Sequence, residues 1–149
     1  MQTSLSHIGL LAIFTGILAL GAIVVAFRMR PAKPSRVALA VTALPALMML
    51  GLFYSLAVHM HQSLGAWPSS IGERGFPAPL VTHAHIAGFY FSIVLLVSIF
   101  AWPAIFLLCL VVRRWRGCVY YLGVYAFSSL VCFGAMLLAP SQFLYWWWD

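Results

Sequence analysis

Acidic side chains are almost missing from this sequence. Only Glu73 and Asp149 are acidic among its 149 residues, and charged residues make up 7% of the chain. Neither acid falls within an apolar run, so the chain lacks a carboxylate pair for acid–base catalysis and a buried acid for a proton or sodium relay. The three cysteines form no Cys-x-x-Cys pair, and we expect small apolar fillers at Cys109, Cys118 and Cys132.

Apolar residues, in contrast, are abundant in this sequence. They make up 64% of the chain, and the mean hydropathy is +1.04. Soluble domains carry about 25% charged residues, so this composition favours a lipid bilayer as the solvent. Backbone polar groups must be hydrogen-bonded inside lipid, which makes each long apolar run a helix. The sequence predicts an all-α integral membrane protein, a single domain with four transmembrane helices in an up-down bundle. The expected spans are about 6–27, 37–59, 85–112 and 118–138, and the outer loop is 60–82.

Basic residues set the expected orientation. Seven of the eight lie in two clusters between apolar runs, RMRPAKPSR at 28–36 and RRWR at 113–116. The positive-inside rule places both clusters in the cytoplasm, so both termini and the 60–82 loop are expected on the outer (periplasmic) side. The net charge of +6 is therefore a topology signal, and we expect no nucleic-acid partner. The pattern favours a retained first span in a bacterial inner (cytoplasmic) membrane.

The third run is longer than the hydrocarbon core requires. At about 1.5 Å per residue a straight helix over 85–112 would overshoot the core. We expect it to tilt, to bend at Pro103 or to begin in the interface, and Pro45 is placed to bend the second run in the same way.

Histidines gather where the outer face is expected. His7 lies at the start of the first run, and the other four flank the loop, as His59 and His61 before it and His83 and His85 after it. Helical residues i and i+2 face about 200° apart. One histidine of each pair can therefore point into the bundle. That arrangement, one ligand from each of two helices at equal depth, is the one bis-histidine haem needs.

Several chemistries fit this histidine cluster. For haem b, the ligands come from the four loop-flanking histidines, and Arg74 is placed to meet a haem propionate. For copper or zinc, a three-histidine set of His7, His59 and His85 is available. A quinone carbonyl could also bond to one imidazole. The structural alternative is a group of interfacial histidines that bind no cofactor and meet water or loop carbonyls.

One short segment resembles a known family. The stretch THAHIAGF at 82–89 is similar to the His-x-His helix starts of haem-copper oxidase and nitric-oxide reductase catalytic subunits. In that family such histidines bind haem or lie beside it. The resemblance covers eight of 149 residues, and it implies haem chemistry and a respiratory setting rather than an oxidase.

The sequence thus leads to one main hypothesis and two alternatives. The main one is a small accessory or structural subunit of a larger membrane complex, plausibly respiratory or electron-transferring, without catalytic activity of its own. Its partners are membrane lipids and larger integral-membrane subunits, contacted through the third span and the tryptophan-rich tail FLYWWWD at 143–149. The alternatives are a b-type haem or metal protein that uses the outer histidines, and a small transporter.

Overall fold

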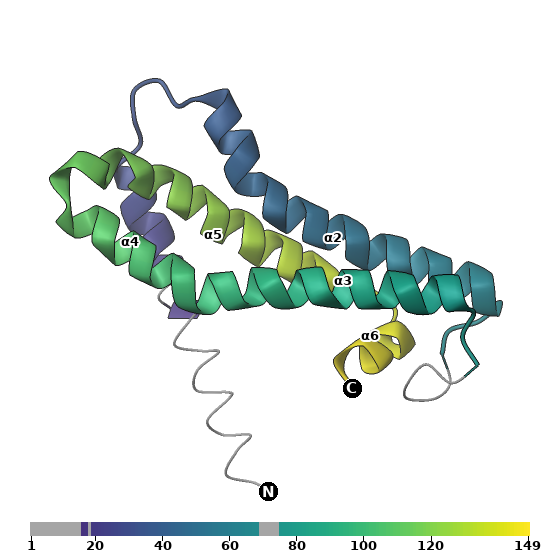
Figure 1. The fold of residues 1–149 in the computed structure, drawn as a ribbon. Coiled ribbons are helices and arrows are strands. Elements are labelled where there is room, and N and C mark those ends of the chain that lie inside the picture. The colour runs from purple at the N-terminus through teal and green to yellow at the C-terminus, as the bar shows by residue number, and fades with distance from the viewer. Residues whose placement is uncertain (1–15, 18, 69–74) are drawn as a thin grey trace, which may run out of the picture. The chain divides into compact units, whose positions relative to one another are not determined.

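The chain is all-helical wherever its structure is described. The computed structural model describes residues 16–17, 19–68 and 75–149, and every regular element among them is a helix (Figure 1). Within these described ranges, three stretches are long and apolar enough to cross a membrane: Arg36–Leu64, Ala78–Val111 and Arg113–Met136. Half of the first expected span, residues 6–15 and 18, lies outside the described residues, and its described part overlaps a shorter apolar helix, Ala19–Arg28.

After that helix, the elements follow in a simple order. They are α2 (Arg36–Leu64), α3 (Ala78–Leu96), a π-helical turn (Val97–Ala101), α4 (Trp102–Val111), a 3-10 turn (Arg113–Trp115), α5 (Arg116–Met136) and α6 (Ser141–Trp148). The long helices are apolar on all sides. Large hydrophobic side chains stay exposed along them, for example Val37 at 73% and Val111 at 78%. A helix that is hydrophobic all round belongs in lipid or in a core, so these surfaces are suited to contact with membrane lipids.

The two helices beside the expected outer loop extend into it. Helix α2 continues to Leu64, and Gly65 follows with a φ of 68°, the left-handed conformation that often ends a helix. Helix α3 begins at Ala78, and the carbonyl of Pro77 accepts bonds from the first turn. The connection is therefore shorter than the 60–82 range predicted from hydropathy, and His61 and His83 both lie on helices.

Helical geometry changes beside Pro103. Proline has no backbone N–H and its ring crowds the carbonyl four residues earlier. The chain accommodates this with the π-helical turn Val97–Ala101, in which the N–H of Trp102 donates to the carbonyl of Val97. Pro45, in contrast, lies inside the continuous helix α2.

The chain divides into two compact units, which we describe separately. The first comprises Met1–Leu44 and Leu96–Ser129. Side-chain hydrogen bonds join the helices of this unit. The indole N–H of Trp102 donates to the carbonyl of Leu122 at 2.9 Å, and the hydroxyl oxygens of Ser98 and Tyr125 lie 2.8 Å apart. Small residues, Ala26 on helix Ala19–Arg28 and Gly123 on α5, let these two helices approach closely. The buried core of this first unit is made up of Ala22, Ala26, Trp102, Phe106, Cys109, Val119 and Ala126.

The second unit comprises Pro45–Leu95 and Leu130–Asp149. The hydroxyl of Tyr54 on α2 donates to the carbonyl of Ala135 on α5 at 2.7 Å. The short helix α6 packs onto α2 through Phe143, whose ring centroid lies 5.0 Å from that of Phe53. Six large side chains of this unit are almost completely buried: Phe53, Leu56, Met60, Leu80, Met136 and Phe143. This packing holds the facing parts of α2 and α3 that carry the histidines.

Candidate functional site

Two histidines from different helices meet in the second unit. Nδ1 of His59 on α2 lies 3.0 Å from Nδ1 of His83 on α3, and the ring centroids are 5.2 Å apart. Both side chains are half-buried. The contact joins one member of each sequence pair, although the two residues are 24 positions apart in the chain.

A serine decides which nitrogen of each ring carries hydrogen. Ser55 lies one helical turn before His59, and its hydroxyl donates to the carbonyl of Leu52 at 2.9 Å. Its oxygen is then an acceptor for Nε2 of His83, 3.2 Å away. A neutral His83 that donates from Nε2 has a bare Nδ1, which accepts from Nδ1–H of His59. The network therefore assigns opposite tautomers to the two rings, and Nε2 of His59 carries no hydrogen.

The remaining candidates are placed differently. His61 is exposed, and its ring lies against Trp67 with centroids 4.7 Å apart. His85 is also exposed, and lies about 200° around α3 from His83. His7 and Arg74, the third metal ligand and the propionate partner proposed from sequence, lie outside the described residues. The structure thus joins His59 to His83, while the proposed metal set had paired it with His85.

Among residues 16–17, 19–68 and 75–149, no group of three or more His, Cys, Asp or Glu side chains could hold a metal ion. The acids are too few to supply one, and Cys109 and Cys132 are buried separately in the cores of the two units. The candidate site is accordingly an imidazole pair supported by one hydroxyl.

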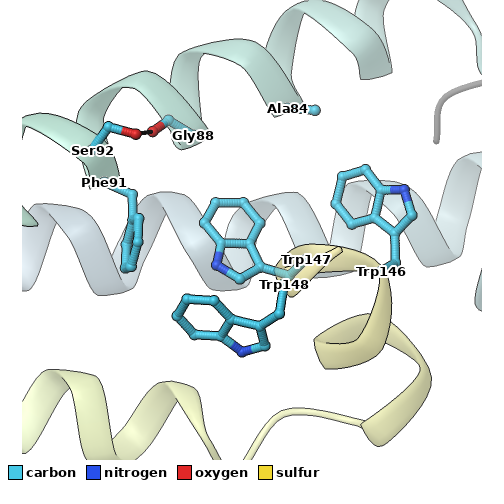
Figure 2. A pocket seen from close by; sticks show the side chains of 7 residues that line it. All are labelled: Ala84, Gly88, Phe91, Ser92, Trp146, Trp147 and Trp148. Atoms are coloured by element: carbon cyan, nitrogen blue, oxygen red, sulfur yellow. Dashed lines mark hydrogen bonds between the residues drawn. The ribbon is translucent and has the colours of Figure 1, made fainter. Parts of the chain in front are cut away.

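A second feature of this unit is an open aromatic pocket. Its volume is about 290 Å³, and one wall is the face of α3 that carries Ala84, Gly88 and Ser92. Figure 2 shows the three tryptophans of α6 across from this wall, with the rings of Trp147 and Trp148 near that of Phe91. The hydroxyl of Ser92 donates to the carbonyl of Gly88 at 2.8 Å. This wall therefore directs no unpaired hydroxyl into the pocket, and the lining suits an apolar occupant.

Sequence reasoning missed how the tail contributes to this pocket. The tail was expected to be a contact surface for larger subunits, and the structure shows in addition that it forms α6 and packs against its own unit: the ring of Phe91 is 5.6 Å from those of Trp147 and Trp148. A signal was present, since Phe143, Trp146 and Trp147 have the i, i+3, i+4 spacing of one helical face. Eight residues are too few for that spacing to predict a helix by itself.

Comparison of the chain with protein-family models, with curated proteins and with solved structures gives no match. The structure defines a class of protein: the described part of the chain is all-helical and contains three helices long and apolar enough to span a membrane. One of its two units carries an inter-helix histidine pair and an aromatic pocket.

Proposed function

We propose that this protein is a small accessory subunit of a larger membrane complex. The observation that carries the proposal is the pocket between α3 and α6, because it joins the third expected span to the tryptophan-rich tail. Small residues at four-residue spacing, Ala84, Gly88 and Ser92, let a neighbouring helix approach the backbone of α3. Tryptophans beside such a position supply large contact area, as they do at the centres of protein interfaces.

The open shape of the pocket suits part of a protein. Its volume, about 290 Å³, is at the lower end of the range for small-molecule sites, about 300–1,000 Å³. The occupant that we propose is a transmembrane helix of the larger subunit, which inserts one apolar side chain between the tryptophans and Phe91.

A photo-crosslinking experiment tests this docking. Benzoylphenylalanine replaces Trp148, which lines the pocket and is 49% exposed. The matched control replaces Ile86, which is 55% exposed and lies two helical positions, about 200°, from both Ala84 and Gly88. We expect irradiation of native membranes to give an adduct with a larger membrane protein from the Trp148 position and none from Ile86. An adduct with a second copy of this chain, with lipid alone, or equally from both positions would refute the proposal.

The full topology is also part of the proposal. We infer four spans in a bacterial inner membrane, with both termini outside. The basic clusters support this orientation, since Arg36 begins α2, Arg113 and Arg114 lie between α4 and α5, and Arg116 begins α5. Fusions test it: alkaline phosphatase should be active after Asp149, and a fluorescent protein inserted after Lys33 should fluoresce in the cytoplasm. The reverse pattern would overturn the orientation.

Haem binding is the second candidate function, because the His59–His83 contact brings together one imidazole from each of two helices. Ligands on opposite sides of one iron are about 4 Å apart, taking about 2.0 Å for each metal–imidazole bond. The observed 3.0 Å means that the rings must separate by about 1 Å to admit the iron. A reduced-minus-oxidised spectrum of the protein in mild detergent tests this candidate. A Soret band that His83→Ala abolishes would support it, and a colourless protein without extractable haem would exclude it.

A further inference from the structure

Positive charge is concentrated in the first unit, and no acidic residue there balances it. Seven of the chain's eight basic residues fall in the two stretches of this unit, Met1–Leu44 and Leu96–Ser129, and neither stretch contains Asp or Glu. All seven side chains are exposed: Arg28, Arg30, Lys33, Arg36, Arg113, Arg114 and Arg116. Their mutual repulsion is unfavourable, so a bound anion would stabilise the surface that carries them.

Two contacts bring the first basic cluster to the start of α5. The ring of Phe27, which precedes this cluster, lies perpendicular to that of Tyr120, with centroids 6.2 Å apart. Near the other end of the cluster, the backbone N–H of Ser35 donates to the hydroxyl of Tyr121 at 2.9 Å. Both tyrosines lie within about 6–8 Å of Arg116 along α5. The positive-inside rule requires the two clusters on one side of the membrane, but it does not require this proximity.

The turn between α4 and α5 aligns two arginines of the second cluster. It is a 3-10 turn, in which the side chains of residues i and i+3 lie one above the other. The N–H of Arg116 donates to the carbonyl of Arg113, so their side chains project from the same side. Nε of Arg116 also donates to the carbonyl of Leu110 at 3.3 Å, which holds its guanidinium near the end of α4. The two terminal NH₂ groups of this guanidinium carry four further N–H donors, in the planar arrangement that matches phosphate oxygens.

An apolar strip on α4 ends two residues before Arg113. Val111 lies four residues after Leu107 and three after Leu108, which are the spacings of one helical face, and all three side chains are exposed. A soluble anion would contact only the arginines and leave this strip bare. A phospholipid carries its phosphate and its acyl chains in one molecule, so it fits both parts of the surface.

From this arrangement we propose that the first unit binds an anionic phospholipid at the turn between α4 and α5. The phosphate accepts hydrogen bonds from Arg113 and Arg116, and the acyl chains lie along Leu107, Leu108 and Val111. The other five basic side chains supply a positive potential, which disfavours headgroups that also carry a cation. The site depends on contacts of the first unit alone, so it stands independently of the pocket in the second unit.

Native mass spectrometry of the full chain, purified in a neutral detergent, tests the binding. Two lipids with the same acyl chains are titrated: dioleoylphosphatidylglycerol, which is anionic, and dioleoylphosphatidylcholine, whose headgroup adds a cation. We expect one tightly bound phosphatidylglycerol per chain, and binding of phosphatidylcholine that is weaker by about 5-fold or more. Equal affinity for the two lipids would overturn the proposal. Displacement of the lipid by glycerophosphoglycerol, which has the headgroup without acyl chains, would also overturn it, because the site would then select free phosphate compounds.

Charge-matched variants separate a site from a diffuse positive surface. Arg113→Gln with Arg116→Gln removes two cations and both phosphate contacts, and should weaken phosphatidylglycerol binding about 30-fold, or about 5-fold for each arginine. Arg28→Gln with Arg30→Gln removes the same charge from the other cluster and should weaken binding by less than about 5-fold, because it acts only through the screened field. Equal losses in the two double variants would show a diffuse field and refute the site.

Lysine at both positions tests the bonding geometry with the charge retained. An ammonium group cannot form the paired N–H bonds of a guanidinium. Arg113→Lys with Arg116→Lys should therefore weaken binding by about 2–10-fold, the factor for one net hydrogen bond. Unchanged affinity in this variant would contradict direct bonding by the guanidinium groups. Helical circular dichroism and elution volume equal to those of the unsubstituted chain identify the variants that keep the fold.

Discussion

Among the glycines of the described residues, Gly123 on α5 has the least room for a side chain. A methyl group added there would meet the Cβ of Ala26, and it would lie 3.6 Å from the Cα of Ala26 and 3.8 Å from the carbonyl oxygen of Ala22. These atoms belong to the backbone and to a Cβ, so no flexible side-chain end can move aside. We expect Gly123→Ala to force helix Ala19–Arg28 away from α5 at a cost of about 1–3 kcal/mol for overpacking.

A matched variant separates this cost from the intrinsic gain of alanine. Alanine in place of a helical glycine is favourable by about 0.8–1.0 kcal/mol. Gly134, on the same helix, has nothing within 4 Å of an added methyl group, so Gly134→Ala shows the gain alone. The difference between the two variants should therefore be about 1–3 kcal/mol. Ala26→Gly in the Gly123→Ala background removes the colliding carbon and should recover much of the loss.

Unfolding in mixed micelles of dodecylmaltoside and SDS, followed by circular dichroism, measures these free energies. Equal free energies of unfolding for Gly123→Ala and Gly134→Ala would show that the two helices are not in close contact. A double variant no more stable than Gly123→Ala alone would refute the role of Ala26.

Three further predictions concern the second unit. Tyr54→Phe removes the hydrogen bond to the carbonyl of Ala135 and should lower the free energy of unfolding by about 0.5–1.5 kcal/mol in the same assay. Tyr145 is 67% exposed, so Tyr145→Phe should change it by less than about 0.5 kcal/mol, and equal effects would contradict the hydrogen bond. Phe143→Ala empties a completely buried site and should cost about 3–5 kcal/mol, with a red shift in tryptophan emission as α6 detaches, and an unshifted spectrum would mean that α6 stays in place. In ¹⁵N NMR of the metal-free protein above pH 7.5, His59 should carry its hydrogen on Nδ1, and a hydrogen on Nε2 would refute the assigned network.

Much of the fold follows from composition. Apolar runs long enough for a bilayer, with their backbone bonds satisfied internally, predict helices, and the described residues are helical. The ends of the runs were less well predicted. Hydropathy falls at histidines and serines even where the helix continues, so the predicted runs stopped at 59 and began at 85. In the structure α2 extends to Leu64 and α3 starts at Ala78. Only the backbone shows where a helix ends, as at Gly65 with its positive φ.

The candidate site was predicted in outline but not in detail. The i, i+2 spacing lets only one histidine of each pair face inward, and it favours neither member. The usual guide, an apolar stripe opposite a polar face, does not apply to helices that are apolar all round. Burial of Leu56 and Met60 on α2 and of Leu80 and Ala87 on α3 instead sets the rotation of each helix.

The sequence by itself determined the class of this protein: its few charges and long apolar runs leave lipid as the solvent and the helix as the local structure. It also determined that histidines would gather near the ends of two helices. Only the tertiary structure decided that His59 contacts His83, that Ser55 is hydrogen-bonded to His83, and that the tail forms α6 and a pocket against α3. The physical reason is that hydropathy depends on composition along one chain, whereas a contact depends on how side chains from distant segments fit together.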